Sequence, residues 1–190
     1  MTAAEPREDD RRAHFTRLAA LVHEPIHRYA MRRVDPSDVD DIVAETLLVL
    51  WRRLDDVPAE AELPWCYNVA RNCVANLRRS AHRRVRLTLR LADELHVTPD
   101  RDGSAAESGQ GVDAALASLP AKEREVVMLW AWEGLAPREI AVALGTSANA
   151  VSLRLSRAKR RMKSYLASHG ARQDLASAGQ EVRVSEKEAR

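Results

Sequence analysis

Residues 137–162 read PREIAVALGTSANAVSLRLSRAKRRM, and this stretch decides the fold. Two apolar patterns of helical period stand on either side of Gly145-Thr146-Ser147. Gly145 suits the left-handed position after one helix, and Ser147 suits the N-cap of the next. Two short helices joined by a glycine-containing turn form a helix-turn-helix. The predicted packing joins Ile140, Ala141 and Leu144 to Val151, Leu155, Ala158 and Met162.

The opposite face of the second helix predicts DNA binding. From Ile140 to Gln173 every charged residue is basic, whereas solvated faces usually mix signs. Residues near the start of such a helix enter the major groove, and arginine can grip guanine or phosphate with two hydrogen bonds. The face consists of Asn149, Ser152, Leu153, Ser156, Arg157 and Arg160.

The rest of the second half completes a four-helix domain, predicted to span residues 112–168. Helical segments are expected at 112–118, 121–133, 137–144 and 147–167, separated by proline and glycine signals. Residues 92–111 lose apolar periodicity and gain Gly, Ser and Asp, which predicts a flexible linker. Residues 169–190 are polar and aperiodic, which predicts a disordered tail.

The first half, residues 11–91, predicts a second small helical domain. Apolar residues recur at helical spacing over 11–32, 39–54 and 65–82, with Ser37 or Asp35 available as the N-cap of the middle helix. The third pattern carries a polar stripe that includes Asn68, Arg71 and Asn72 and contains no acid. Ala, Leu, Arg and Glu dominate the composition. The fold class is therefore all-α, with two helical domains joined by a flexible linker.

Charge is distributed in blocks although the net charge is only +2. From Asp35 to Glu62 there are nine acidic residues and two basic ones, and from Leu63 to Ala92 there are seven arginines and no acid. These blocks indicate two kinds of partner, a basic surface for the acidic block and a polyanion for the arginine-rich ones.

Several features argue against other functions. Cys66 and Cys73 are interpreted as small core residues, because two helical turns separate their Cα atoms by about 10 Å, too far for a disulfide. The six histidines show no metal-ligand spacing, so neither metal nor cofactor is predicted. No apolar run approaches the about 20 residues of a membrane span, and residues 1–12 lack a signal-peptide pattern. We therefore expect a cytoplasmic protein without membrane insertion or small-molecule substrate.

The tryptophans are expected mainly in packing roles. Trp51, Trp130 and Trp132 lie within helical patterns and are interpreted as core or domain-packing residues. Trp65 opens the third helix, where a core position and a wedge facing a DNA strand are both open.

Five motifs in order resemble the extracytoplasmic-function (ECF) group of the sigma-70 family of RNA polymerase sigma factors. LPAKEREVV (119–127), EGLAPREIA (133–141) and AVSLRLSRA (150–158) resemble the domain that binds the promoter −35 element. DVDDIVAETL (38–47) is similar to the polymerase-clamp helix of that family, and PWCYNVARN (64–72) to its −10-binding and melting helix. The resemblance covers about residues 15–166, with a linker where the family has one.

The resemblance implies roles for individual residues and three partners: core RNA polymerase, promoter DNA and an anti-sigma factor. Acidic side chains that meet the polymerase would be Asp38, Asp41 and Glu45. The loop from Asp55 to Leu63 would hold a flipped base. Readers of the −10 element would be Trp65, Asn68, Arg71, Asn72, Asn76 and Arg79. Contacts to the −35 element would be Arg138, Ser147, Asn149, Ser152, Leu153, Ser156, Arg157, Lys159 and Arg160.

Other classes of protein remain open at this point. A response-regulator-type activator shares the Leu-Pro…Glu-Ile-Ala layout, but residues 1–90 show no strand pattern for a receiver domain. An adaptor that binds helices and not DNA is opposed by the arginines between Arg71 and Arg90. An enzyme is the weakest alternative, since no nucleophile–base pair or phosphate loop is present.

Overall fold

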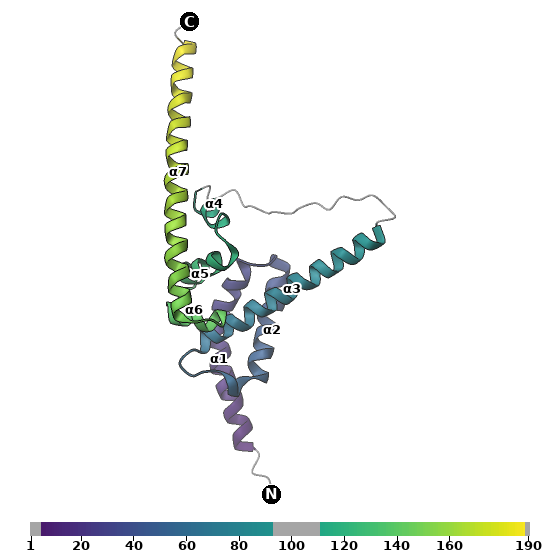
Figure 1. Ribbon diagram of the computed structural model, residues 1–190. Coiled ribbons are helices and arrows are strands. Elements are labelled where there is room, and N and C mark those ends of the chain that lie inside the picture. The colour runs from purple at the N-terminus through teal and green to yellow at the C-terminus, as the bar shows by residue number, and fades with distance from the viewer. Residues whose placement is uncertain (1–4, 93–110, 189–190) are drawn as a thin grey trace.

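A computed structural model of the chain describes residues 5–92 and 111–188, and every regular element in these ranges is a helix (Figure 1). The first domain holds three long helices, α1 (Glu5–Met31), α2 (Val39–Arg52) and α3 (Glu62–Ala92). Two short 3₁₀ turns, η1 (Pro36–Asp38) and η2 (Leu54–Asp56), flank α2. The predicted all-α fold with two helical domains is confirmed.

The first domain is held by the apolar stripes of its three helices. Ile26 of α1, Ile42 and Leu50 of α2 and Cys66 of α3 are each at most 2% exposed. Thr46 is the one buried polar residue reported for the described ranges, and its hydroxyl donates to the Ile42 carbonyl at 2.7 Å. Asp35 caps η1 by accepting a hydrogen bond from the Ser37 amide. The N-cap of α2 is Asp38, so neither of the two predicted residues caps the middle helix.

Two helices of this domain begin earlier than the sequence predicts. The predicted start of α1 was residue 11, whereas its first residue is Glu5. The predicted start of α3 was Trp65, but the helix begins at Glu62, so the loop ends before Pro64. A proline in the first turn costs little, because amides there have no partner within the helix. Cys66 and Cys73 are buried free thiols, as predicted.

The second domain contains α4 (Val112–Ala117), α5 (Ala121–Ala131), α6 (Pro137–Leu144) and α7 (Ala148–Glu188). Ile140 and Ala141 of α6 pack with Val151, Leu155 and Ala158 of α7 in a common buried core, and Leu144 and Met162 lie at its edge. The predicted helix-turn-helix packing is confirmed, and the domain has the four helices predicted for it.

The sequence predicts a disordered tail at 169–190, whereas the chain remains helical up to Glu188. Helix α7 continues to Glu188 and projects well beyond the other helices of its domain (Figure 1). Extending an existing helix needs no new nucleus, and the tail is rich in Ala, Glu, Gln, Lys and Arg, which favour helix. The predicted flexible linker lies almost wholly at 93–110, outside the described residues.

The tryptophans divide between two environments. Trp51 packs edge-to-face on Phe15, with ring centroids 5.2 Å apart, as a packing residue should. Trp130 and Trp132 are 42% and 45% exposed, so neither is a core residue. The Arg32 guanidinium of the first domain lies 6.0 Å from the centre of the Trp132 ring, which agrees with the domain-packing alternative for Trp132. Trp130 and Trp132 line an open apolar pocket of about 410 Å³ on the second domain, together with Leu116 and Met162. Helical periodicity alone does not distinguish a buried position from the wall of such a pocket.

Candidate nucleic-acid and protein interface

The proposed reading face of α7 is open to solvent and held at a fixed angle by the turn before it. Gly145 adopts the left-handed conformation (φ 60°), and the Thr146 amide donates to the Ala141 carbonyl at 2.9 Å, which closes the end of α6. Ser147 Oγ then accepts the Ala150 amide at 3.2 Å and caps α7. Exposed side chains on the face are Asn149, Ser152, Leu153, Ser156, Arg157 and Arg160.

Three predicted −35 contacts have other partners or places. Ser147 is committed to the cap. Ser152 stays on the reading face, and its Oγ also donates to the Ala148 carbonyl at 3.0 Å. Lys159 lies at the flank of the face, with its ammonium 3.5 Å from the centre of the Trp130 ring. Arg138 is exposed at the start of α6, one helix away from the others. The structure therefore gathers the six residues of the reading face and places these three around its edges.

The polar stripe of α3 forms a ladder of side-chain contacts. The amide of Asn72 donates to the Asn68 carbonyl oxygen at 3.1 Å, and Arg79 donates to the side chain of Asn76 one turn further on. Arg71 is half-buried and its Nε has no hydrogen-bond partner. Trp65 is half-buried at the start of the helix, with the Arg53 guanidinium 5.5 Å from its ring. All six predicted −10 residues thus share one side of α3.

The acidic ridge of α2, Asp38, Asp41 and Glu45, faces away from the domain core. Asp41 and Glu45 are exposed and Asp38 is half-buried. None of the three takes part in an ion pair among the described residues. Unpaired carboxylates in a row on one helix leave a negative surface that an external basic partner can neutralise.

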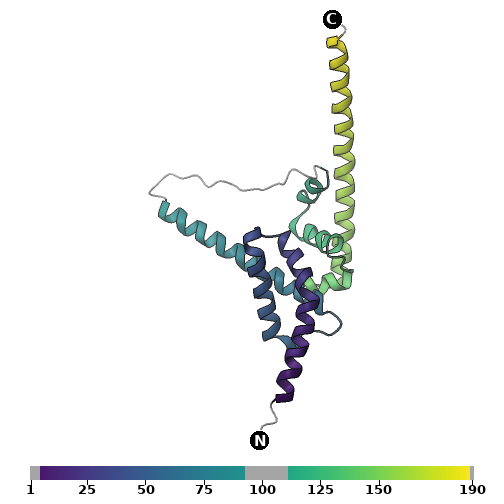
Figure 2. The same ribbon diagram turned by 180° about the vertical axis from the view of Figure 1, so that it is seen from behind.

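The second domain packs directly on α3, where α6 makes its main contact with the first domain (Figures 1 and 2). The Asn68 amide donates to the Ala143 carbonyl at 2.9 Å and lies 3.4 Å from the Val142 carbonyl, both in α6. One end of the −10 stripe is therefore in contact with the second domain.

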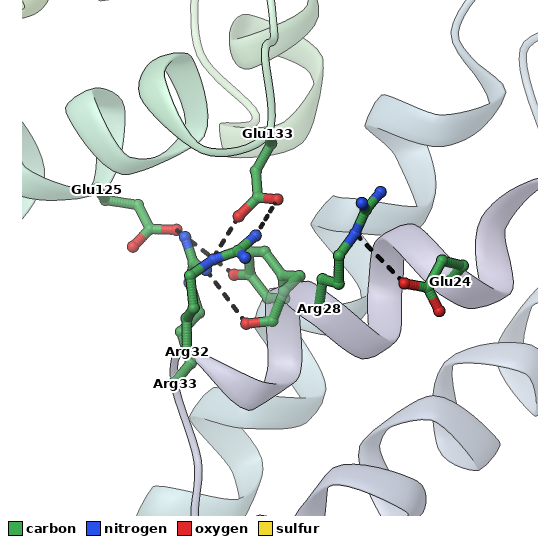
Figure 3. A network of polar contacts seen from close by, with 7 residues as sticks. Glu24, Arg28, Arg32, Arg33, Glu125 and Glu133 are labelled. Atoms are coloured by element: carbon green, nitrogen blue, oxygen red, sulfur yellow. Dashed lines mark hydrogen bonds and ion pairs between the residues drawn. The ribbon is translucent and has the colours of Figure 1, made fainter.

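A cluster of charged residues completes this contact (Figure 3). Glu133 lies between Arg32 Nη2 at 2.5 Å and Arg33 Nη1 at 3.3 Å, and Figure 3 shows its carboxylate reaching both guanidinium groups. The side chains of Arg33 and Glu133 are 4% and 2% exposed. Glu125 lies 3.5 Å from Arg33 and 3.4 Å from the Tyr29 hydroxyl. We call Arg32, Arg33, Glu125 and Glu133 the interdomain ion cluster.

The interdomain ion cluster was missed from the sequence. Arg32 and Arg33 follow the last helical turn of α1, and Glu133 precedes Gly134 in the loop after α5, positions where charges usually face water. A weak signal was present, because Tyr67 and Tyr29 are large residues on helix faces next to these charges. Their rings lie 5.3 Å apart, and burial raises the pKa of both hydroxyls.

The described residues offer little for catalysis. Burial raises the pKa of the Cys66 thiol to about 12 and that of Cys73 to about 11, so both are protonated and unreactive at neutral pH. Within the same ranges no group of His, Cys, Asp and Glu could hold a metal ion. None of the described helices combines the length and hydrophobicity required to cross a membrane.

Comparison with known proteins gives a consistent result for both domains. The family model Sigma-70 region 2 matches residues 18–84, and the model Sigma-70, region 4 matches residues 110–162. RNA polymerase sigma factor NccH of Alcaligenes xylosoxydans xylosoxydans is 34% identical over 144 residues, which cover 71% of this chain and 76% of that protein. ECF RNA polymerase sigma factor SigL of Mycobacterium tuberculosis is 34% identical over 144 residues, 72% of this chain and 79% of that one.

A solved structure has the same fold. It is the sigma factor RpoE in complex with the anti-sigma factor NepR from Bartonella quintana, with a TM-score of 0.57 and 23% sequence identity. The match covers 80% of this chain and 96% of that one.

Proposed function

The chain belongs to the ECF group of the sigma-70 family of RNA polymerase sigma factors, and from this premise we propose how its surfaces divide the work. As an alternative sigma factor it directs RNA polymerase to promoters. We assign polymerase binding to α2, −10 recognition and melting to α3, and −35 recognition to α7. The family consists of transcription initiation factors, and we propose no catalytic activity for the chain.

The acidic ridge is the proposed docking surface for core polymerase. Asp41 and Glu45 are exposed and unpaired among the described residues, so binding a basic partner breaks no internal ion pair. Complementary charges on two proteins speed up their encounter and fix how the two surfaces align when they bind. The buried face of the same helix, with Ile42 and Leu50, ties the ridge to the domain core and keeps the carboxylates in place.

The stripe on α3 is the proposed −10 surface. Asn72, Asn76 and Arg79 are exposed, and amide and guanidinium groups suit the base edges and phosphates of a separated strand. Extruding a base from the duplex costs a few kcal/mol. Stacking and hydrogen bonds to the base in one protein pocket can offset a free energy of this size. The loop between η2 and α3 is the proposed place for that base. Residues 169–190 receive no role in DNA binding.

The reading face of α7 is the proposed −35 surface, and the open geometry of that face is the observation that carries the assignment. Arg157 and Arg160 stand one turn apart with no ion pair in the described chain, free for guanine or phosphate. Ser152 and Ser156 leave room for close approach to base edges. The domains are proposed to comprise residues 11–91 and 112–168, and the protein to act in the cytoplasm.

An anti-sigma factor is the third proposed partner. The solved structure with the same fold is itself bound to an anti-sigma factor, and we extend that kind of partner to this chain. An exposed apolar pocket with Trp130 and Trp132 on its wall supports the proposal, because exposed apolar patches mark protein contacts.

Transcription in vitro tests the proposal as a whole. Purified chain with core RNA polymerase is expected to initiate at a specific subset of a genomic promoter library, whereas core enzyme alone does not. Absence of any promoter-specific start with a folded, polymerase-bound chain would refute the function.

A pair of variants tests the division of surfaces. Asp41→Lys with Glu45→Lys is expected to weaken core binding strongly while leaving binding of the isolated chain to −35 duplex unchanged. Arg157→Ala is expected to leave core binding unchanged and to weaken −35 recognition by about tenfold, since one bidentate base contact is worth about 1–3 kcal/mol. Opposite outcomes for the two variants would overturn the assignment.

A further inference from the structure

A cleft of about 830 Å³ lies between the two domains and carries a strong excess of positive charge. Its walls come from the end of α1, from α3, from the first turns of α5, from the helix-turn-helix turn and from α7. Seven basic side chains line it against one acid, Glu125. Known small-molecule sites have volumes of about 300–1,000 Å³, so the cleft has the size of a ligand site.

Part of this charge is already used inside the protein. Arg32 and Arg33 pair with Glu133, and Arg124 donates to the carbonyls of Leu116, Ala117 and Leu119. The rest is not neutralised. No ion pair among the described residues involves Arg71, Lys122 or Arg154.

Two arginines on the wall have buried guanidinium nitrogens without acceptors. The Arg33 side chain is 4% exposed, yet its Nε and Nη2 have no hydrogen-bond partner, although Nη2 lies 3.5 Å from Glu125. Arg71 Nε is also buried without a partner. Buried donors on a charged group are costly to leave unpaired, so a bound acceptor would remove a penalty here. The N-terminus of α5 adds partial positive charge to the same wall.

We propose that this cleft binds a small polyphosphate anion, either inorganic or the phosphate chain of a nucleotide. Several phosphate oxygens in a row offer the acceptors that Arg71, Lys122 and Arg154 lack, and arginine pairs with phosphate through two hydrogen bonds. Arg71 belongs to the first domain, whereas Lys122 and Arg154 belong to the second. The ligand therefore bridges the domains and stabilises their contact.

Occupation of the cleft has a direct consequence for DNA binding. Arg71 is part of the proposed −10 stripe, so a bound polyphosphate competes with the DNA strand for that side chain. The same anion favours the arrangement in which Asn68 contacts α6. The cleft thus links a small anion to the availability of the −10 surface.

The test is binding to the purified full-length chain, measured without polymerase or DNA. Isothermal titration with inorganic tripolyphosphate is expected to show one saturable site. Lys122→Ala with Arg154→Ala is expected to weaken binding by about a hundredfold, since a hydrogen bond to a charged group is worth about a factor of ten. The control, Arg52→Ala with Lys163→Ala, removes the same charge from exposed positions outside the cleft and is expected to change binding less than twofold.

Further arms separate the sources of phosphate and the rival explanations. ATP tighter than tripolyphosphate identifies a nucleotide, and the reverse order identifies inorganic polyphosphate; either supports the proposal. Equal loss in the cleft and control variants means attraction by net charge alone and overturns it. The proposal is also overturned if the chain binds a single-stranded oligonucleotide but shows no saturable binding of tripolyphosphate or ATP. Circular dichroism of each variant confirms that helix content is unchanged. Because no promoter is involved, failure here leaves the sigma-factor function untouched.

Discussion

The two helices proposed to touch DNA differ in how ready they are to do so. The six residues on the reading face of α7 are all exposed. On α3, by contrast, Asn68 is hydrogen-bonded to α6, and Arg71 is half-buried in the cleft between the domains. In this arrangement the −35 surface is open while one end of the −10 surface is covered.

If α3 reads the −10 element as proposed, the second domain has to move before the first can hold a strand. The contact between the domains includes the interdomain ion cluster and the Asn68 hydrogen bonds, and the buried apolar residues of both domains belong to one hydrophobic cluster. The ion cluster and the Asn68 hydrogen bonds are the part of this contact that single substitutions can break. Four predictions test this comparison, from the largest expected effect to the smallest.

Glu133→Ala is expected to have the largest effect. It leaves Arg33 buried without its closest acid, and removal of one partner of a buried pair typically costs about 3–5 kcal/mol. We expect the domains to separate, seen as a larger radius of gyration in small-angle X-ray scattering. Glu60→Ala removes an exposed acid and serves as the control. An unchanged radius in the Glu133 variant would mean that other contacts hold the domains together.

Asn68→Ala and Asn149→Ala compare the covered and open surfaces directly. Asn68→Ala removes the contacts to α6, and a net value of about 1 kcal/mol for the hydrogen bond to the Ala143 carbonyl predicts a shift of roughly fivefold toward separated domains. Asn149→Ala is expected to leave the domain equilibrium unchanged. Energy transfer between dyes on introduced cysteines measures the equilibrium between docked and separated domains. The native thiols do not take up dye, because both are buried and protonated. Equal shifts in both variants would remove the distinction between the surfaces.

Ser147→Ala tests how firmly the start of α7 is fixed. Loss of an N-cap costs about 1 kcal/mol, which lowers the melting temperature of a small domain by about 4–8 °C. The expected effect is confined to the transition of the second domain in calorimetry. Ser156→Ala, on the same helix but in no hydrogen bond of the described chain, is the control. A cap that contributes nothing would give identical melting temperatures in the two variants.

The first turn of α3 carries an ion pair between Glu62 and Arg17, so its stability should respond to acid. A hydrogen bond from Arg17 and its positive charge lower the pKa of Glu62 from its ordinary value of 4.5. A lowered pKa means that the stabilisation is present above that value and is lost as pH falls through the folded-state pKa. We expect the stability difference between the wild type and Glu62→Gln to vanish below that range. A difference that persists at low pH would rule out the ion pair as its cause. The effect is small, because Arg17 is well exposed.

The sequence predicts local structure well where several signals agree at one place. Gly145, Ser147 and the apolar spacing of Ile140 and Val151 all indicate the same turn, and the structure has it. The contact between the domains could not be predicted, because Arg33 and Glu133 are far apart in the chain and each resembles a solvated charge at a helix end. Pairing of that kind depends on the tertiary arrangement and leaves no periodic pattern.

Other errors have the same origin in local information. Trp130 has the spacing of a core residue, but its ring forms a pocket wall and contacts Lys159. The tail lacks an apolar stripe, so it gave no helical period, yet it extends a helix that is already nucleated. Of the proposed site residues, the reading face and the acidic ridge follow from periodicity. The covered end of the −10 stripe does not.

Helix α7 carries the reading residues near one end and continues without a break for 41 residues, a length of about 60 Å. Such a helix behaves as a lever arm. A small change in the angle at which the reading face meets a groove becomes a large displacement at the far end. A fluorophore attached near residue 185 would therefore report the docking angle of the recognition helix in single-molecule recordings. Promoters on which α7 docks at different angles would give different signals.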